Sequence, residues 1–264
     1  MRVLSKCPFA VLALLAGTTA FSQDKAPAPS FTFTGNVGVV SDYRFRGLTQ
    51  TSYNGALQGG VDVAHKSGLY VGAWASNVKW IKDYVGATAG DTEVDLYGGY
   101  KHEIATDLTV DIGAIGYLYP DNTAAKVTTA TYKNADTTEV YLGLTYKMVT
   151  FKYFYSTDNF LANANSTGAR YFDLSATFDL GGGFSLTPHA GIQTIPNQTS
   201  ATATANAGDY RDYSLTLGKD FGNGLAASAG FVNVVGADPT FYLGSGNNQM
   251  VSRPGWVFGL KYSF

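Results

Sequence analysis

The sequence predicts an all-β fold, a twelve-stranded antiparallel up-and-down transmembrane β-barrel. Three observations predict it: segments of about ten residues alternate apolar and polar side chains, the connections between them alternate between short and long, and one such segment ends at Phe264. The composition agrees, because 31 glycines, 18 tyrosines and only 14% charged residues favour strands and turns over long helices.

Residues 1–22 are predicted to be a secretory signal peptide. Two basic residues precede an apolar run from Phe9 to Ala16, and small residues lead to a cleavage site after Ser22. A membrane anchor is the alternative, but the run is shorter than the roughly 20 residues that a spanning helix needs. We expect an exported chain with a flexible lead-in over residues 23–30 and a barrel over residues 31–264.

In the first half of the barrel, alternation starts at Phe31, and even positions stay mostly polar as far as Arg46. The five strands expected here cover about residues 31–46, 56–64, 69–79, 93–101 and 108–118. The third is ambiguous, because both of its faces are fairly apolar. Its expected outward residues are Tyr70, Trp74, Val78 and Trp80.

The second half continues the alternation, which is clearest over residues 172–180. There Phe172, Leu174 and Phe178 are expected to face outward. The seven strands expected here cover about residues 139–147, 151–156, 172–180, 184–193, 212–217, 225–231 and 256–264.

The connections support a barrel more firmly than any one strand does. Short ones are expected at residues 65–68 and near 104–106, 148, 181–183 and 221–223, and long ones near 47–55, 81–92, 120–137, 157–169, 195–209 and 235–254. Outer-membrane barrels have tight periplasmic turns and long external loops. A β-sandwich is the alternative, but it would have loops of mixed length.

The last strand supports the same location. Its outward residues include Tyr262 and Phe264, and a terminal strand of this kind resembles the signal that outer-membrane proteins present to the barrel-assembly machinery. We therefore expect the cell outer membrane as the location, with membrane lipids and that machinery as partners.

Charged and polar side chains on the expected inward face suggest a hydrated lumen, because charges facing lipid are costly. The candidates for lining it are Asp42, Arg44, Arg46, Asp62, Glu93, Asp95, Lys101, Asp111, Glu139, Lys147, Lys152, Asp173 and His189. Twelve strands predict a narrow channel. Arg44 and Arg46 are expected to form a positively charged constriction, or else ion pairs with Asp42 or an acid of a neighbouring strand.

Catalytic, metal and nucleic-acid sites are not expected. His189 is expected to point into the lumen, where a polar lining role is favoured over a lipase-like one. Glu93 and Asp95 have the spacing of a calcium pair but also of an ordinary polar face. The cysteine, Cys7, falls in the predicted signal peptide. The near-even balance of 18 basic and 20 acidic residues gives no reason to expect a nucleic-acid partner, and no cofactor is expected.

Residues 41–47, with the sequence SDYRFRG, resemble a motif of the TorF family of porins, proteobacterial outer-membrane proteins formerly of unknown function. Residues 68–77, 95–100, 117–120, 139–141 and 212–215 resemble the same family in the same order. The resemblance implies passive diffusion of small hydrophilic solutes or ions.

Two functions remain open from the sequence. The first is a porin, a diffusion channel for small hydrophilic solutes or ions. The alternative is a structural or surface-interaction barrel with a blocked lumen, which binds through its long loops. An enzyme is not expected, and the oligomeric state and the solute stay open.

Overall fold

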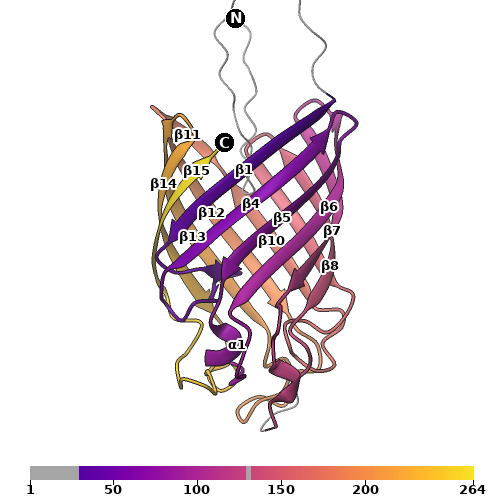
Figure 1. Cartoon of the computed structure of the whole chain (residues 1–264), viewed down its shortest axis with the longest axis vertical. Coiled ribbons are helices and arrows are strands. Elements are labelled where there is room, and N and C mark those ends of the chain that lie inside the picture. The colour runs from indigo at the N-terminus through magenta and orange to yellow at the C-terminus, as the bar shows by residue number, and fades with distance from the viewer. Residues whose placement is uncertain (1–29, 129–131) are drawn as a thin grey trace, which may run out of the picture.

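The computed structural model describes residues 30–128 and 132–264, which form a closed β-barrel (Figure 1). Thirteen strands form the sheet, and a pairing of β10 (Arg170–Ala176) with β12 (Phe184–Thr194) closes it. β10 and β11 (Phe178–Gly181) are two parts of one barrel-spanning strand interrupted at Thr177, so thirteen minus one gives the twelve predicted strands. The predicted signal peptide and the lead-in as far as residue 29 lie outside the described residues.

The order of the strands is up-and-down, as predicted. The other barrel strands are β1 (Phe31–Val40), β4 (Ala56–His65), β5 (Leu69–Asn77), β6 (Thr92–Ala105), β7 (Leu108–Leu118), β8 (Thr137–Tyr146), β9 (Val149–Ser156), β13 (Tyr210–Gly222), β14 (Leu225–Val235) and β15 (Gly255–Ser263). Each pairs antiparallel with its neighbours along the chain, and β1 pairs with β15. The long connections contain β2 (Arg44–Phe45), β3 (Leu48–Thr49), α1 (Trp80–Asp83) and a 3-10 helix (Ala124–Lys126).

The outer surface of the barrel is apolar. Every barrel strand has at least one exposed large apolar side chain, and Phe33, Leu57 and Phe258 reach 73%, 61% and 57% exposure. Phe172 and Leu174 point outward as predicted. This arrangement, an apolar exterior around a polar interior, is typical of barrels surrounded by lipid.

Among the described residues, no helix is long and apolar enough to cross a membrane.

β5 faces the opposite way from the prediction. The Tyr70 hydroxyl donates to Asp111 Oδ1 at 2.6 Å inside the barrel, and Leu69 is the residue exposed outside. Trp74 also points inward, with its ring 5.4 Å from that of Tyr43. Val78 and Trp80 lie beyond the strand and are buried in the connection that follows. The prediction failed because the large inward rings make both faces of this strand apolar.

The short turns lie at one end of the barrel and the long connections at the other (Figure 1). The turn after β8 lacks Gly, Asn, Asp and Pro, and Lys147 itself takes the left-handed conformation there, with φ 53°. The expectation that Lys147 lines the lumen is therefore wrong: it is exposed in the turn, with Nζ 5.3 Å from the centre of the outward Tyr146 ring.

The strands β1 and β15 are joined up to the last residue. The Phe264 backbone N–H donates to the Gly35 carbonyl at 2.9 Å, and the Gly35 N–H donates to the Phe264 carbonyl at 2.8 Å. The end of β15 lies at the short-turn end of the barrel (Figure 1). Backbone hydrogen bonding is thereby continuous across this seam, which leaves no free sheet edge there.

Candidate functional site

The lumen is crossed by residues 41–55, the connection between β1 and β4, which we call the inward segment. β1 ends at Val40, and the predicted extension of the first strand to Arg46 is wrong. Instead, β2 and β3 pair as a small hairpin, with Phe45 opposite Leu48. The Asp42 carboxylate accepts a hydrogen bond from the Thr49 hydroxyl at 2.5 Å, which ties the two ends of this hairpin together.

The inward segment contacts several strands of the barrel wall. The Tyr43 hydroxyl donates to Glu93 of β6 at 2.9 Å, and the Phe45 ring packs against Tyr117 of β7 at 5.4 Å. Arg46 reaches β8 and β12, as described below. A segment that starts from β1 and touches these strands must pass through the interior of the barrel.

The turn at Arg46 and Gly47 brings the backbone against the far wall. Arg46 has φ 48° and Gly47 has φ 81°, both in the left-handed region that favours glycine. A Cβ atom on Gly47 would lie 2.6 Å from Asp212 Cβ of β13 and 2.7 Å from Val234 Cγ2 of β14. Glycine is thus required here for its conformation and for the close approach.

Arg46 is paired with a carboxylate inside the barrel. Its guanidinium donates to both oxygens of Glu139 on β8, at 2.5 and 3.1 Å, and to Gln193 Oε1 on β12 at 2.9 Å. The side chains of Arg46 and Glu139 are only 5% and 0% exposed. Two-point pairs of this kind are the strongest and most directional contacts that arginine makes.

Aromatic rings complete the surroundings of the guanidinium. The rings within 5.3 Å of Arg46 Cζ belong to Phe45, Phe154, Phe160 and Tyr171. Burial by itself lowers the pKa of Arg46, but the adjacent Glu139 carboxylate more than offsets this, so that the pKa lies above its ordinary value. Arg46 therefore stays charged, and its charge is neutralised within the wall.

Arg44 is paired as well. Its Nε forms an ion pair with Asp42, and its Nη1 donates to the carbonyls of Gly47 and Arg253, each at 2.9 Å. The two arginines expected to form a positive constriction thus form ion pairs, which is the alternative that the sequence left open. The constriction is made by the backbone and rings of the inward segment, and its charge is balanced.

A cavity of about 360 Å³ lies between the inward segment and the wall formed by β10, β12 and β13. His189 lines it, with Nε2 3.0 Å from Asp173 Oδ2 and Nδ1 3.5 Å from Asp212 Oδ1. The Tyr171 hydroxyl donates to Asp212 at 3.0 Å. Both ring nitrogens of His189 face carboxylates, so neither is placed to take a proton from Ser214, which also lines the cavity.

On the opposite wall, tyrosine hydroxyls bind the inward carboxylates. Tyr97 donates to Asp62 at 2.6 Å, and Tyr70, which donates to Asp111, also contacts the hydroxyl of Tyr141. The sequence analysis missed these inward tyrosines, although Tyr97 and Tyr141 share the parity of the predicted lumen acids. Parity was therefore the signal that could have identified them.

Glu93 and Asp95 lie side by side on the inner face of β6 and are buried. Glu93 Oε2 and Asp95 Oδ1 have no hydrogen-bond partner among the described residues. The described residues hold no group of three or more His, Cys, Asp or Glu side chains that could bind a metal ion. Within the described part of the chain, no third carboxylate, histidine or cysteine joins this pair.

The residues predicted to line the lumen, other than Lys147, lie on the barrel strands or in the inward segment. The inner face of the barrel strands carries Asp62, Glu93, Asp95, Lys101, Asp111, Glu139, Lys152, Asp173 and His189. Asp42, Arg44 and Arg46 lie in the inward segment and not on a strand. Lys152 is near the inward Tyr141 ring, and Lys101 is paired in register with Asp111.

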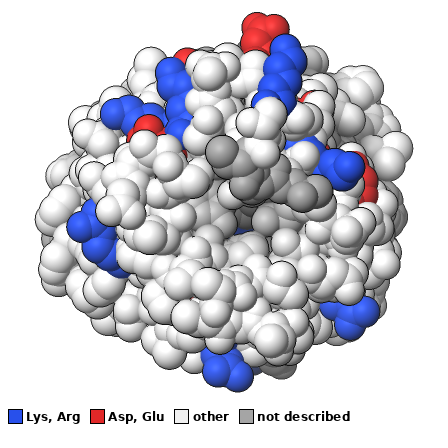
Figure 2. Space-filling model, turned by 90° about the horizontal axis from the view of Figure 1, so that it is seen from below, with Lys and Arg blue, Asp and Glu red and all other residues white. Residues whose placement is uncertain are grey.

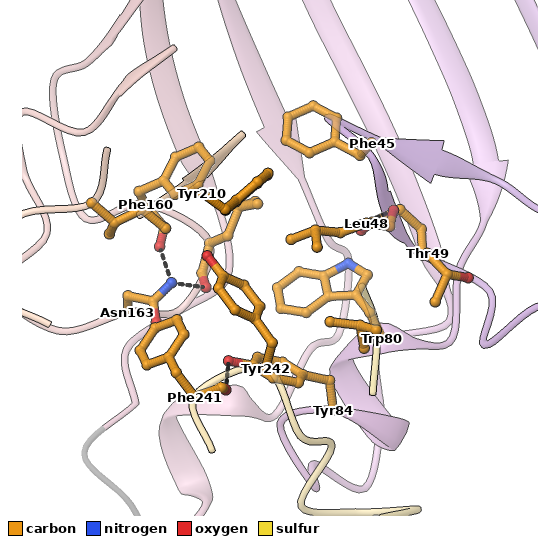
Figure 3. Close-up of a pocket in the computed structure, with 14 residues that line it drawn as sticks. Phe45, Leu48, Thr49, Trp80, Tyr84, Phe160, Asn163, Tyr210, Phe241 and Tyr242 are labelled. Atoms are coloured by element: carbon orange, nitrogen blue, oxygen red, sulfur yellow. Dashed lines mark hydrogen bonds between the residues drawn. The ribbon is translucent and has the colours of Figure 1, made fainter. Parts of the chain in front are cut away.

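The outer side of the inward segment is covered by an aromatic cluster at the long-loop end (Figure 3). We call it the loop-end cluster, and it consists of Phe45, Leu48, Trp80, Tyr84, Phe160, Tyr210 and Tyr242 around a cavity of only about 50 Å³. The Tyr84 hydroxyl donates to the Phe241 carbonyl at 2.7 Å, and burial raises the pKa of Tyr84. The inward segment is thus packed from outside as well as held from within.

The same end of the molecule is hollowed near its centre (Figure 2). Mostly uncharged atoms surround the hollow, and Lys and Arg side chains lie toward the periphery (Figure 2).

Comparisons with known proteins give a family and a fold. A family model described as a bacterial protein of unknown function, Gcw_chp, matches residues 24–264. The comparison with curated protein sequences found no match. The NanC porin structure is similar, with a TM-score of 0.52 and 10% identity over 88% of this chain and 99% of that chain. The KdgM porin is similar, with a TM-score of 0.51 and 6% identity over the same shares. At such identities the likeness shows the barrel fold alone.

Proposed function

The chain belongs to the Gcw_chp family of bacterial proteins of unknown function, and from its barrel fold we propose that it is a porin, an outer-membrane channel for passive diffusion of small hydrophilic solutes or ions. The finer assignment to the TorF family of porins is part of this proposal. The chain would reach the membrane by a cleaved signal peptide over residues 1–22.

The observation that carries the proposal is the polar cavity inside an apolar shell. The barrel has lipid-compatible residues outside, whereas its interior holds ionisable groups and an open volume of about 360 Å³. Ionisable groups facing the interior of a membrane barrel are typical of a hydrated path. The similar folds of the NanC and KdgM porins support this function.

The inward segment would set the size limit of the channel. It crosses the lumen near the long-loop end and is fixed to the far wall by the Glu139 and Gln193 contacts of Arg46. Solutes would pass beside this segment, so ions and molecules of a few heavy atoms are expected, and long oligomers are not. Transport would follow the concentration gradient, without an energy source.

A barrel with a blocked lumen, acting through its loops, is the second candidate. It is favoured by the extent to which Arg46 and the loop-end cluster fill the mouth. In that case the inward segment would be a permanent plug and not a size limit.

Conductance in planar bilayers separates the two candidates. The full mature protein, shown to be folded by heat-modifiable migration on gels, is compared with a variant that lacks residues 43–50. Steady single-channel steps from the unaltered protein, enlarged in the variant, would support the porin. Silence from the unaltered protein with steps from the variant would support the plugged barrel. Liposome swelling with sugars, amino acids and small acids then ranks the solutes.

Insertion by the barrel-assembly machinery is proposed from the last strand. Tyr262 and Phe264 are exposed on the outer face, at 47% and 63%. Removal of Phe264 should lower the amount of folded barrel in outer-membrane fractions, while replacement of the inward Ser263 by Ala should not. Equal amounts of the two variants would contradict this part of the proposal.

A further inference from the structure

The cavity beside His189 carries uncompensated negative charge. Two carboxylates, Asp173 and Asp212, lie on its wall, and a protonated His189 could balance only one of them. The two arginines at its edge already have carboxylate partners, Arg44 with Asp42 and Arg46 with Glu139. With both carboxylates ionised, the charge balance of the cavity is negative in either protonation state of the imidazole.

Burial makes this imbalance significant. The Asp212 side chain is 3% exposed and the Asp173 side chain is 25% exposed. Besides His189, Asp212 is contacted by the neutral hydroxyl of Tyr171, which lies 3.0 and 3.1 Å from its two oxygens. A carboxylate withdrawn from water is stabilised much more by a cation than by a neutral donor.

The cavity has the size and lining of a small-molecule site. Its volume of about 360 Å³ falls within the usual range for ligand pockets and exceeds what a bare ion needs. The rings of Tyr117, Phe154 and Tyr171 line it beside the carboxylates. Two of these rings already lie against a cation, since Arg46 Cζ is 4.4 Å from the centre of Tyr171 and 5.0 Å from that of Phe154.

We propose that this cavity is a binding site for a small organic cation, whose charged group lies against Asp173 and Asp212 while its carbon skeleton contacts the aromatic rings. In the porin this would make organic cations the preferred solutes, and that consequence rests on the proposed function. Binding itself does not, because the cavity exists whether or not the barrel conducts.

Choline and its uncharged isostere 3,3-dimethylbutan-1-ol test the site directly. Titration calorimetry of the full mature protein in detergent compares the two probes, which share shape and differ in charge. We expect choline to bind at least about tenfold more tightly than the isostere, because a cation held against aromatic rings in a shielded site gains at least about that factor. Equal binding of the two probes, or tighter binding of an anion such as glycolate, would overturn the proposal.

Variants of the cavity carboxylates test whether choline binds at this site. Asp173→Asn combined with Asp212→Asn should weaken choline binding by about tenfold or more and leave the isostere unchanged. The matched control is Asp62→Asn, which removes a carboxylate bound to Tyr97 on the opposite wall and should leave choline binding unchanged. Unchanged choline binding in the double variant would overturn the proposal. If the double variant does not fold, the comparison of probes on the unaltered protein decides.

Conductance measurements distinguish failure of the cation site from failure of the proposed porin function. A barrel that conducts but binds choline no better than the isostere would retain the porin and refute the cation site. A silent barrel that binds choline through Asp173 and Asp212 would retain the site and refute the porin.

Discussion

Arg46 and Glu139 form a two-point ion pair inside the barrel, with nitrogen to oxygen distances of 2.5 and 3.1 Å. Glu139 lies on β8, the fifth strand from β1 in sheet order, whereas Arg46 belongs to the connection that leaves β1. One side-chain pair thus fixes the inward segment to a distant part of the wall. The width of the lumen at this level depends on it.

Replacement of Glu139 by Gln should release the inward segment. The variant leaves the Arg46 charge buried without its partner, a change that costs about 3–5 kcal/mol in comparable sites. We expect larger single-channel conductance and faster proteolytic cleavage within residues 41–55. Asp62→Asn is the control, because its carboxylate binds Tyr97 and not the inward segment. Conductance and cleavage equal to those of the unaltered protein would show that the pair does not hold the segment.

Gly47→Ala should displace the same segment by a steric route. The new Cβ would lie 2.6 Å from Asp212 Cβ, and a left-handed conformation disfavours alanine by about 1–2 kcal/mol. Gly236→Ala separates these two causes, since Gly236 has φ 80° and no atom within 4 Å of the added Cβ. Only Gly47→Ala should change the conductance, measured in the same bilayers. An equal change in both variants would mean that backbone strain alone is responsible.

Removal of both arginines, by Arg44→Ala and Arg46→Ala, should shift ion selectivity toward cations. The reason is that Asp42 and Glu139 lose the charges that now neutralise them. The combination Arg46→Met with Glu139→Gln removes a cation and an anion together, so its reversal potential in a salt gradient should stay unchanged. If that neutral combination also shifted the reversal potential toward cations, Arg46 would be acting as an unpaired charge.

Leu174→Lys should destabilise the barrel in phospholipid vesicles by about 2–4 kcal/mol, because a lysine on the lipid face must be withdrawn from water. Leu174 is 51% exposed on the outside. The adjacent Ser175 points inward, and Ser175→Lys should be tolerated. Urea unfolding followed by tryptophan fluorescence measures both. Similar stability of the two variants would argue against a lipid-facing exterior.

The strand pattern could be predicted from sequence because alternation is a local property. Phe172 and Leu174 face outward and Asp173 faces inward, as period-two alternation requires. The strand β5 was predicted with its faces reversed, since the rings of Tyr70 and Trp74 resemble lipid-facing residues until their inward partners are known. Those partners, Asp111 and Tyr43, lie on other elements.

The inward segment could not be predicted for a related reason. Phe45 and Arg46 continue the apolar and polar alternation of β1, so local pattern extends the strand past its true end. What ends it is the left-handed turn at Arg46 and Gly47 together with contacts to residues 93 and 147 positions further along the chain. Interactions at such separations leave no signature in a short window of sequence.

The pairing of β1 with β15 can form only after the last strand of the barrel has been synthesised. The strand made first in the barrel has β15, the strand made last, as one of its two partners, so the barrel stays open until synthesis of the last strand. Any intermediate shortened before residue 255 would expose two unpaired strand edges to other chains. Quality control that recognises such edges would remove incomplete molecules before they could leak or aggregate.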